Sequence, residues 1–126
     1  MHKQSGWSDQ EAGHTWTNAP TAELTFQIKD GAGKELVLDV KAFPFLKKGL
    51  TAQPVKVLAN GVQVAEWSIS KEDMFKADIP ASVMKTDELN VRFEIAHPSS
   101  PKENGFSDDA RMLGMAVTQV CITKQE

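Results

Sequence analysis

The sequence predicts an all-β protein, an antiparallel β-sandwich of the jelly-roll type with about eight strands. Apolar residues recur at every second position along most of the chain, which is the period of a strand that buries one face. Turn-forming residues separate these segments at short intervals. The helix-like window from Ala81 to Thr86 is too short to be more than a turn. Because crossover helices have no room, the sheets are expected to be antiparallel.

The first half of the chain begins with two predicted strands. Residues 22–29 alternate between apolar and polar side chains and end at the turn sequence Asp30-Gly31-Ala32-Gly33. Residues 36–41 continue the alternation. Residues 43–53 predict a loop, because they contain a proline, a glycine and two lysines.

A β-hairpin is predicted next. Asn60-Gly61 separates the apolar-rich residues 54–59 from residues 62–67, and Asn-Gly is the sequence best suited to the positive φ angles of a type I′ turn. In the second arm the apolar positions change parity, which indicates a β-bulge near Ala65-Glu66.

The second half of the chain contains the remaining predicted strands. Residues 75–79 form a short strand that Pro80 closes, and residues 89–97 form the longest clean alternation. A polar loop at residues 98–109 precedes the last strand, expected from about Met112 to Thr123.

The alternation also predicts the core. The residues expected to be buried are Leu24, Phe26, Ile28, Leu36, Leu38, Val55, Val57, Leu89, Val91, Phe93 and Ile95. Cys121, the single cysteine, lies in the last apolar strand and is expected to be buried as a small hydrophobic residue. It cannot form an internal disulfide, so cysteine usage leaves the redox compartment open.

Composition indicates one domain of 126 residues with a net charge of -3. We expect residues 1–5 to be an unstructured or vector-derived lead, residues 6–124 to form one β-sandwich, and residues 125–126 to be a tail. The chain has no basic patch of the kind that binds nucleic acid, so no nucleic-acid partner is expected. It also has no transmembrane run or signal-peptide core, so we expect no direct membrane insertion, and we expect a monomer.

The first candidate site is near the N-terminus and contains Trp7, Glu11, His14 and Trp16. Exposed indoles stack on the apolar faces of sugar rings, while carboxylates and imidazoles hydrogen-bond to hydroxyl groups. This combination suits carbohydrate recognition. The alternative, favoured for either tryptophan taken alone, is that the indole covers the edge of the core.

The second candidate site is a late loop with Glu103, Ser107, Asp108, Asp109 and Arg111, of which the last three are the candidate ligand-binding residues. Its carboxylates suggest Ca²⁺, but the spacing matches no Ca²⁺ loop and Arg111 adds a competing positive charge, so no metal is expected. We expect Arg111 to pair with a carboxylate, with Glu11 the first choice and Asp109 the second, and so to tie the two ends of the chain together.

Catalysis has little support in the sequence. Residues 105–109 lack the second glycine of a nucleophile elbow. The three histidines, His2, His14 and His97, have no metal-ligand spacing. We therefore expect no catalytic residue, no cofactor and no independent enzymatic activity.

The order of several motifs resembles a known family. The motifs are Gly6-Trp7, Glu11, Gly13-His14-Thr15-Trp16, Gln53-Pro54-Val55, Asn60-Gly61, Ser100-Pro101, and Asp109, Arg111 and Leu113-Gly114. Together they are similar to the C-terminal β-sandwich module of bacterial membrane-anchored envelope-glycan enzymes, phosphoglycerol transferases and membrane glycosyltransferases. The resemblance implies a non-catalytic accessory domain, similar in architecture to carbohydrate-binding modules, on the periplasmic or extracytoplasmic face of the inner membrane. The candidate residues it implies are Trp7, Glu11, His14, Trp16, Asp109 and Arg111.

Two functions remain open at this point. The domain either assists glucan recognition by binding an oligosaccharide, or is a structural or protein-interaction sandwich that packs against its own catalytic domain. The exposure of the tryptophans distinguishes these two functions. A binding module needs Trp7 or Trp16 on a concave surface with polar groups around it.

Overall fold

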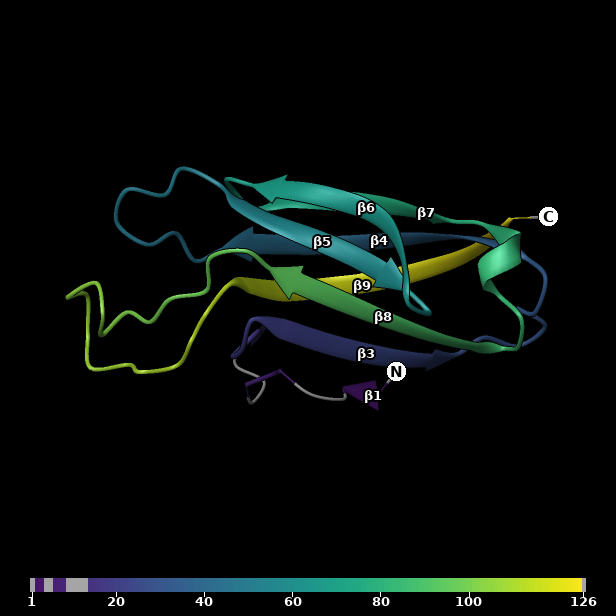
Figure 1. Ribbon diagram of the computed structural model, residues 1–126, viewed down its shortest axis with the longest axis horizontal. Helices are drawn as coiled ribbons and strands as arrows, with labels where there is room; N and C mark the ends of the chain where they lie inside the picture. The colour runs from purple at the N-terminus through teal and green to yellow at the C-terminus, as the bar shows by residue number, and fades with distance from the viewer. Residues whose placement is uncertain (1, 4–5, 9–13, 126) are drawn as a thin grey trace.

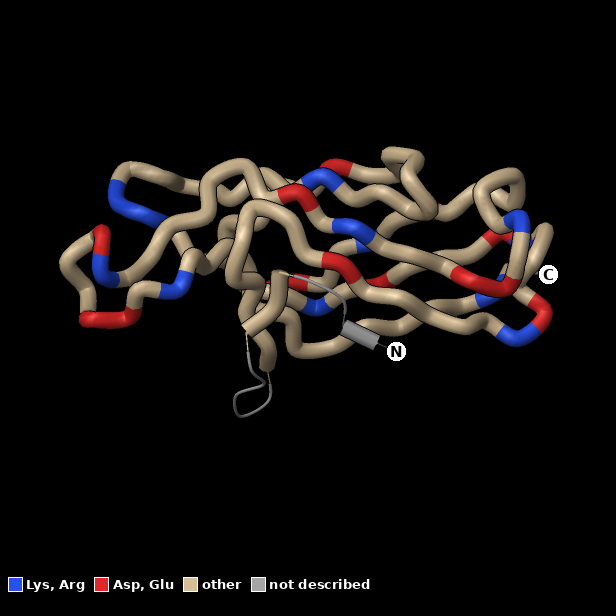
Figure 2. The backbone as a smooth tube through the Cα atoms, turned by 60° about the horizontal axis from the view of Figure 1, so that its bottom comes forward, with Lys and Arg blue, Asp and Glu red and all other residues tan. Residues whose placement is uncertain are grey.

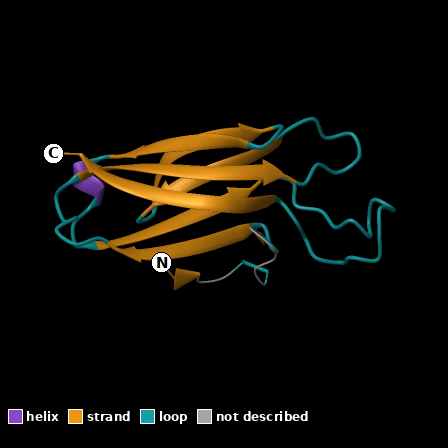
Figure 3. Ribbon diagram, turned by 180° about the vertical axis from the view of Figure 1, so that it is seen from behind, coloured by secondary structure: helices purple, strands orange, loops and turns teal. Residues whose placement is uncertain are grey.

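The structure is a computed structural model in which residues 2–3, 6–8 and 14–125 are described. Two antiparallel sheets pack face to face (Figures 1 and 3). The elements are β1 (His2–Lys3), β2 (Thr15–Trp16), β3 (Thr21–Gln27), β4 (Glu35–Pro44), β5 (Gln53–Ala59), β6 (Val62–Ile69), β7 (Asp73–Ile79), the 3₁₀ turn η1 (Ala81–Val83), β8 (Glu88–Ile95) and β9 (Met115–Gln125).

The two sheets confirm the predicted all-β sandwich. One has the strand order β1-β3-β8-β5-β6 and the other β2-β9-β4-β7. Every strand pairing that the structure describes within the two sheets is antiparallel. Among the described residues, η1 is the one helical element, and none forms a helix long and apolar enough to cross a membrane.

The core lies between the facing sheets, where the alternation predicts it. All of the predicted core residues are buried except Ile28, which is half-buried and packs against the others. Trp67 on β6 joins them with only 6% of its surface exposed, and its indole N–H donates to the carbonyl of Lys76 at 3.0 Å. This hydrogen bond satisfies the one polar atom that the ring brings into the core.

The predicted hairpin is confirmed. Asn60 and Gly61 have φ angles of 47° and 86°, as a type I′ turn requires. The Asn60 side chain also accepts a hydrogen bond from the Asn90 N–H and donates to the Glu88 carbonyl, which joins the turn to β8. The bulge is at Val64, because Val57 pairs with Ala65 while Leu58 pairs with Gln63. It therefore lies one residue before the predicted Ala65-Glu66 position.

Several element boundaries differ from the prediction. β4 continues to Pro44, so Phe43 and Pro44 are strand residues rather than loop residues. β9 begins at Met115 rather than near Met112. His2–Lys3 of β1 pairs with β3, and β9 reaches Gln125, so strands include residues of the expected lead and tail.

The prediction that Cys121 is buried is wrong, because its side chain is exposed. Lys41 pairs with Gln119 while Ala42 pairs with Val117, so Thr118 is an extra residue in β9. A bulge changes which face the following side chains occupy. Val120 and Ile122 consequently pack against the core, and Cys121 faces outward.

Two long loops project from the same end of the sandwich, which we call the loop end (Figure 1). They are residues 45–52 and 96–114. At their base, the buried side chain of Gln53 exchanges two hydrogen bonds with the backbone of His97. Further out, the Lys48 N–H donates to Asn104 Oδ1 at 2.9 Å, and Asn104 is itself buried. These contacts hold the two loops together.

Gly6 gives a test of the N-terminal attachment. Its φ is +88°, and an added Cβ would lie 1.9 Å from the Thr21 carbonyl oxygen. Gly49 has nearly the same φ, +85°, but nothing lies within 4 Å of an added Cβ. Gly49→Ala should therefore cost only the left-handed strain, about 1 kcal/mol. Gly6→Ala should cost about 2 kcal/mol more because of the clash. Chemical denaturation of both variants measures the difference, and equal costs would contradict the close approach of Gly6 to β3.

Candidate functional site

Two aromatic side chains meet on the outer face of the four-stranded sheet. Trp16 of β2 pairs with Ala116 of β9, and Ala116 pairs with Phe43 of β4, so the three form one row across the sheet. Because Ala116 is small, the two rings approach above it, with centroids 5.3 Å apart and planes at 84°. Ala116 is consequently buried although it faces outward.

The row extends into an aromatic patch, defined as His14, Trp16, Phe43, Phe45 and Phe106. His14 lies two residues before Trp16, and its ring centroid is 6.0 Å from Trp16 and 5.4 Å from Phe43. Phe45 is 6.4 Å from Trp16, and Phe106 is 6.2 Å from Phe45. All of these contacts are edge-to-face, the arrangement that aromatic quadrupoles favour. The patch therefore joins the sheet to both loops of the loop end.

The exposure of the patch increases toward the loops. His14, Trp16, Phe43 and Phe45 are half-buried, whereas 56% of Phe106 is exposed. The Lys48 ammonium lies 5.7 Å from the Phe106 ring centroid, within the range of a cation–π contact. The patch thus presents a supported aromatic ring beside a hydrogen-bond donor, a combination that suits the apolar face and the hydroxyl groups of a sugar.

Arg111 pairs with Asp109 within one loop and reaches the N-terminal segment through Ser8; we call these three residues the latch. Arg111 Nη2 lies 2.6 Å from Asp109 Oδ2, and Arg111 Nη1 donates to Ser8 Oγ at 3.0 Å. Hydrogen bonds from the Arg111 side chain, and then from its backbone N–H, lower the pKa of Asp109 below its ordinary value of 3.8. Asp109, the second choice, is therefore confirmed as a carboxylate partner of Arg111. The ion pair itself lies within one loop, and the link to the N-terminal segment is the hydrogen bond to Ser8. The first choice, Glu11, lies outside the described residues.

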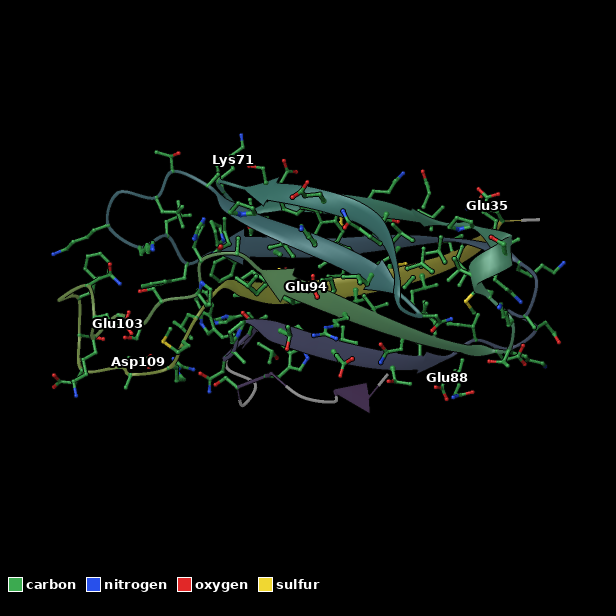
Figure 4. All side chains as sticks on the ribbon, in the orientation of Figure 1. Glu35, Lys71, Glu88, Glu94, Glu103 and Asp109 are labelled. Atoms are coloured by element: carbon green, nitrogen blue, oxygen red, sulfur yellow. The ribbon has the colours of Figure 1, made fainter. Side chains whose placement is uncertain are left out.

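The two loops of the loop end carry different charges. Figure 2 shows basic positions on the loop at residues 45–52 and both acidic and basic positions on the loop at residues 96–114, where Figure 4 labels Glu103 and Asp109. Asp108 is exposed. In the part of the chain that the structure describes, no group of three or more His, Cys, Asp or Glu side chains could hold a metal ion.

Trp7 is separate from the patch. Its indole N–H donates to the Glu23 carbonyl at 2.8 Å, and its ring meets Phe93 edge-to-face at 6.2 Å. It is half-buried and packs against the core, as the alternative interpretation of the tryptophans expects. The two indoles therefore do not form one platform. The Ser8 N–H, which donates to the Trp16 carbonyl, connects the latch to β2.

The sequence interpretation missed four residues of this surface: Phe43, Phe45, Lys48 and Phe106. Phe43-Pro44-Phe45 carried a usable signal, because two aromatic residues at strand spacing after 36–41 share a face of that strand. Phe106 and Lys48 have no such signal in the sequence, since the positions of these residues depend on how two loops pack. A separate surface depression of about 460 Å³, beside Asn60, Val83 and Glu88 at the opposite end, contains no predicted site residue.

Comparison with solved structures gives matches at low identity. A family 35 carbohydrate-binding module from an environmental isolate superimposes with a TM-score of 0.56 at 12% identity, over 98% of this chain and 85% of that one. In fold, the chain is similar to carbohydrate-binding modules. The EclA C-terminal domain, a sugar-binding protein, gives a TM-score of 0.54 at 13% identity, over 80% of this chain and 64% of that one.

A larger enzyme also contains a similar fold. A family GH115 4-O-methyl-α-glucuronidase with specificity for decorated arabinogalactans gives a TM-score of 0.57 at 9% identity. The match covers 90% of this chain but only 14% of the glucuronidase. No protein-family model and no curated protein matches the chain. At these identities the likeness is one of fold.

The Asp109 pKa gives a testable pH dependence. A carboxyl group whose folded-state pKa is lowered stabilises the fold above its unfolded pKa and loses that contribution as pH falls through the folded pKa. Asp109→Asn should therefore unfold more easily than wild type at neutral pH. The difference between the two proteins should disappear in acid well below 3.8, the ordinary pKa of Asp109. Urea denaturation of wild type and Asp109→Asn, from neutral pH to acid, measures this difference in stability. Asp108→Asn is the control, because Asp108 is exposed in the same loop. A difference that is constant with pH would contradict an ionic latch.

Proposed function

We propose that this chain is a non-catalytic carbohydrate-binding domain, and that an oligosaccharide binds at the aromatic patch beside Lys48. The observation that carries the proposal is Phe106, a largely exposed ring supported from behind by Phe45 and flanked by an ammonium group. The fold likeness to proteins described as carbohydrate-binding modules and as a sugar-binding protein supports it.

Each residue of the patch has a defined task in this proposal. A sugar ring stacks on Phe106, and the Lys48 ammonium donates hydrogen bonds to hydroxyl groups at its rim. Phe45, Trp16 and Phe43 fix the surface through edge-to-face packing, so little conformational entropy is lost on binding. His14 adds a second polar group at the opposite margin of the patch.

The expected affinity is low. One largely exposed ring provides a small stacking area, which corresponds to millimolar binding, about -4 kcal/mol. Such affinity is useful to a domain joined to another domain, since the attachment raises the local concentration of glycan near the neighbouring active site. This argument favours an accessory domain over an independent lectin.

The parent protein forms part of the proposal. The motif order supports a bacterial phosphoglycerol transferase or membrane glycosyltransferase that acts on glucan, with this domain on the periplasmic or extracytoplasmic side of the inner membrane. Protease treatment of spheroplasts that carry the tagged parent protein tests the location. Cleavage of the domain from outside is expected, and protection until the membrane is lysed would exclude it.

Substitutions in the patch test glycan binding. Phe106→Ala should reduce affinity for glucan oligosaccharides at least about fivefold, because it removes roughly 1 kcal/mol of ring contact with the sugar. Trp16→Ala should also reduce affinity, because it removes packing that fixes the surface of the patch. Lys48→Met should weaken binding through the loss of a donor. Met74→Ala is the control, since Met74 is 46% exposed on another strand outside the patch. Amide chemical shifts during titration of the isolated chain measure all four variants.

Two results would argue against glycan binding at the patch. Absence of a saturable shift in wild type at tens of millimolar oligosaccharide, a range that would reveal even about -3 kcal/mol, would leave the structural or protein-interaction domain as the surviving function. Saturable binding that Phe106→Ala and Trp16→Ala do not weaken would move the site elsewhere. Appearance of new reducing ends during incubation would contradict a non-catalytic domain.

A further inference from the structure

In the part of the chain that the structure describes, one edge of the four-stranded sheet is paired over only a short length. β9 pairs along its length with β4 on one side. On its other side β2 pairs only with Ala116 and Val117. From Gln119 to Gln125, the described residues provide no strand on this side. Among the described residues, this side of β9 therefore presents backbone N–H and C=O groups without a partner strand, and another strand can pair with such an edge.

This edge lacks the features that usually prevent pairing. Proteins protect sheet edges with outward charges, proline or bulges. The outward side chains of β9 here are Gln119, Cys121 and Thr123, all exposed and none charged. The neighbouring outward positions of β4 carry Asp39 and Lys41. The absence of charge at residues 119–123 is therefore specific to β9, because the outer face of the same sheet carries charges on β4.

The remaining protective features lie at the two ends of the edge. The bulge at Thr118 is next to β2, where pairing is already present. The charge of Lys124 is turned toward the other sheet, because its Nζ donates to the Lys29 carbonyl at 2.8 Å. Between these two ends, no strand of the described residues pairs with residues 119–123 on this side.

The edge is complementary to itself. Two identical strands related by a two-fold axis pair antiparallel, and residues directly opposite each other point to the same face. In the register centred on Cys121, outward Gln119 lies opposite Thr123 of the second copy. Core-facing Val120 lies opposite Ile122, and Lys124 lies opposite Thr118. No like charges oppose each other, and the apolar residues that face the core meet one another.

We propose that two copies of this chain associate through β9, antiparallel and edge to edge, with Cys121 opposite Cys121. The two four-stranded sheets then form one continuous sheet. The contact is short, so the association is weak and depends on concentration. In the monomer expected from the sequence, no described strand pairs with residues 119–123 on this side. The inference is independent of glycan binding, because the aromatic patch lies at the other end of β9.

Oligomeric state and thiol cross-linking form the first test. Sedimentation of the full chain at rising concentration should show a monomer–dimer equilibrium. A short bismaleimide should then trap a covalent dimer of the wild type. Cys121→Ser should abolish the trapped product and leave the sedimentation unchanged, because the thiol reports on the register and does not form the contact. A protein that stays monomeric at millimolar concentration overturns the proposal.

A pair of double variants tests the register. Q119K/T123K places lysine opposite lysine on both sides of the axis, and should weaken association about tenfold through like-charge opposition. Q119K/T123E has the same number of substitutions but places opposite charges together, and should associate at least as well as wild type. Both positions are exposed, so circular dichroism should show the same fold for both. Dimers that respond equally to the two variants, or that bismaleimide cannot trap, would overturn the Cys121-centred pairing.

Discussion

The alignment of β9 between β2 and β4 is the constraint on which the rest of the surface depends. It places Ala116 between Trp16 and Phe43, and a larger side chain there would separate the two rings. The bulge at Thr118 then sets the face that each later residue of β9 occupies. The register of β9 against β2 and β4 consequently determines where the aromatic patch lies and which side chains of β9 face outward.

Most residues of the motif order stabilise the fold. Gly6 and Gly114 occupy positions where an added Cβ would collide with Thr21 or Ile95. Gln53 bonds to the backbone at the base of the loop end. These tasks are structural and require no ligand. His14 and Trp16 differ from these structural residues, because their rings contact each other on the outer face of a sheet, away from the core.

The sequence was sufficient for those parts of the fold that depend on local pattern. Period-two alternation predicts burial of residues such as Val91 and Phe93, since a strand has only two faces, and Asn60-Gly61 predicts its turn from backbone sterics. Cys121 shows the limit of this reasoning, because a single extra residue in β9 exchanges the two faces. The contact between the Phe45 and Phe106 rings could not be predicted from the sequence, since it depends on the packing of two loops far apart in sequence.

The three tryptophans have three different surroundings, and this gives the protein internal optical probes. Trp67 is sealed in the core with its N–H bonded to Lys76, so its fluorescence should be blue-shifted and insensitive to additives in the solvent. Trp7 reports on the attachment of the N-terminal segment through its bond to Glu23. Trp16 lies in the surface patch, where a quencher or a bound molecule can reach it. A change in emission therefore originates from Trp7 or Trp16, with the buried indole of Trp67 as a constant reference within the same chain.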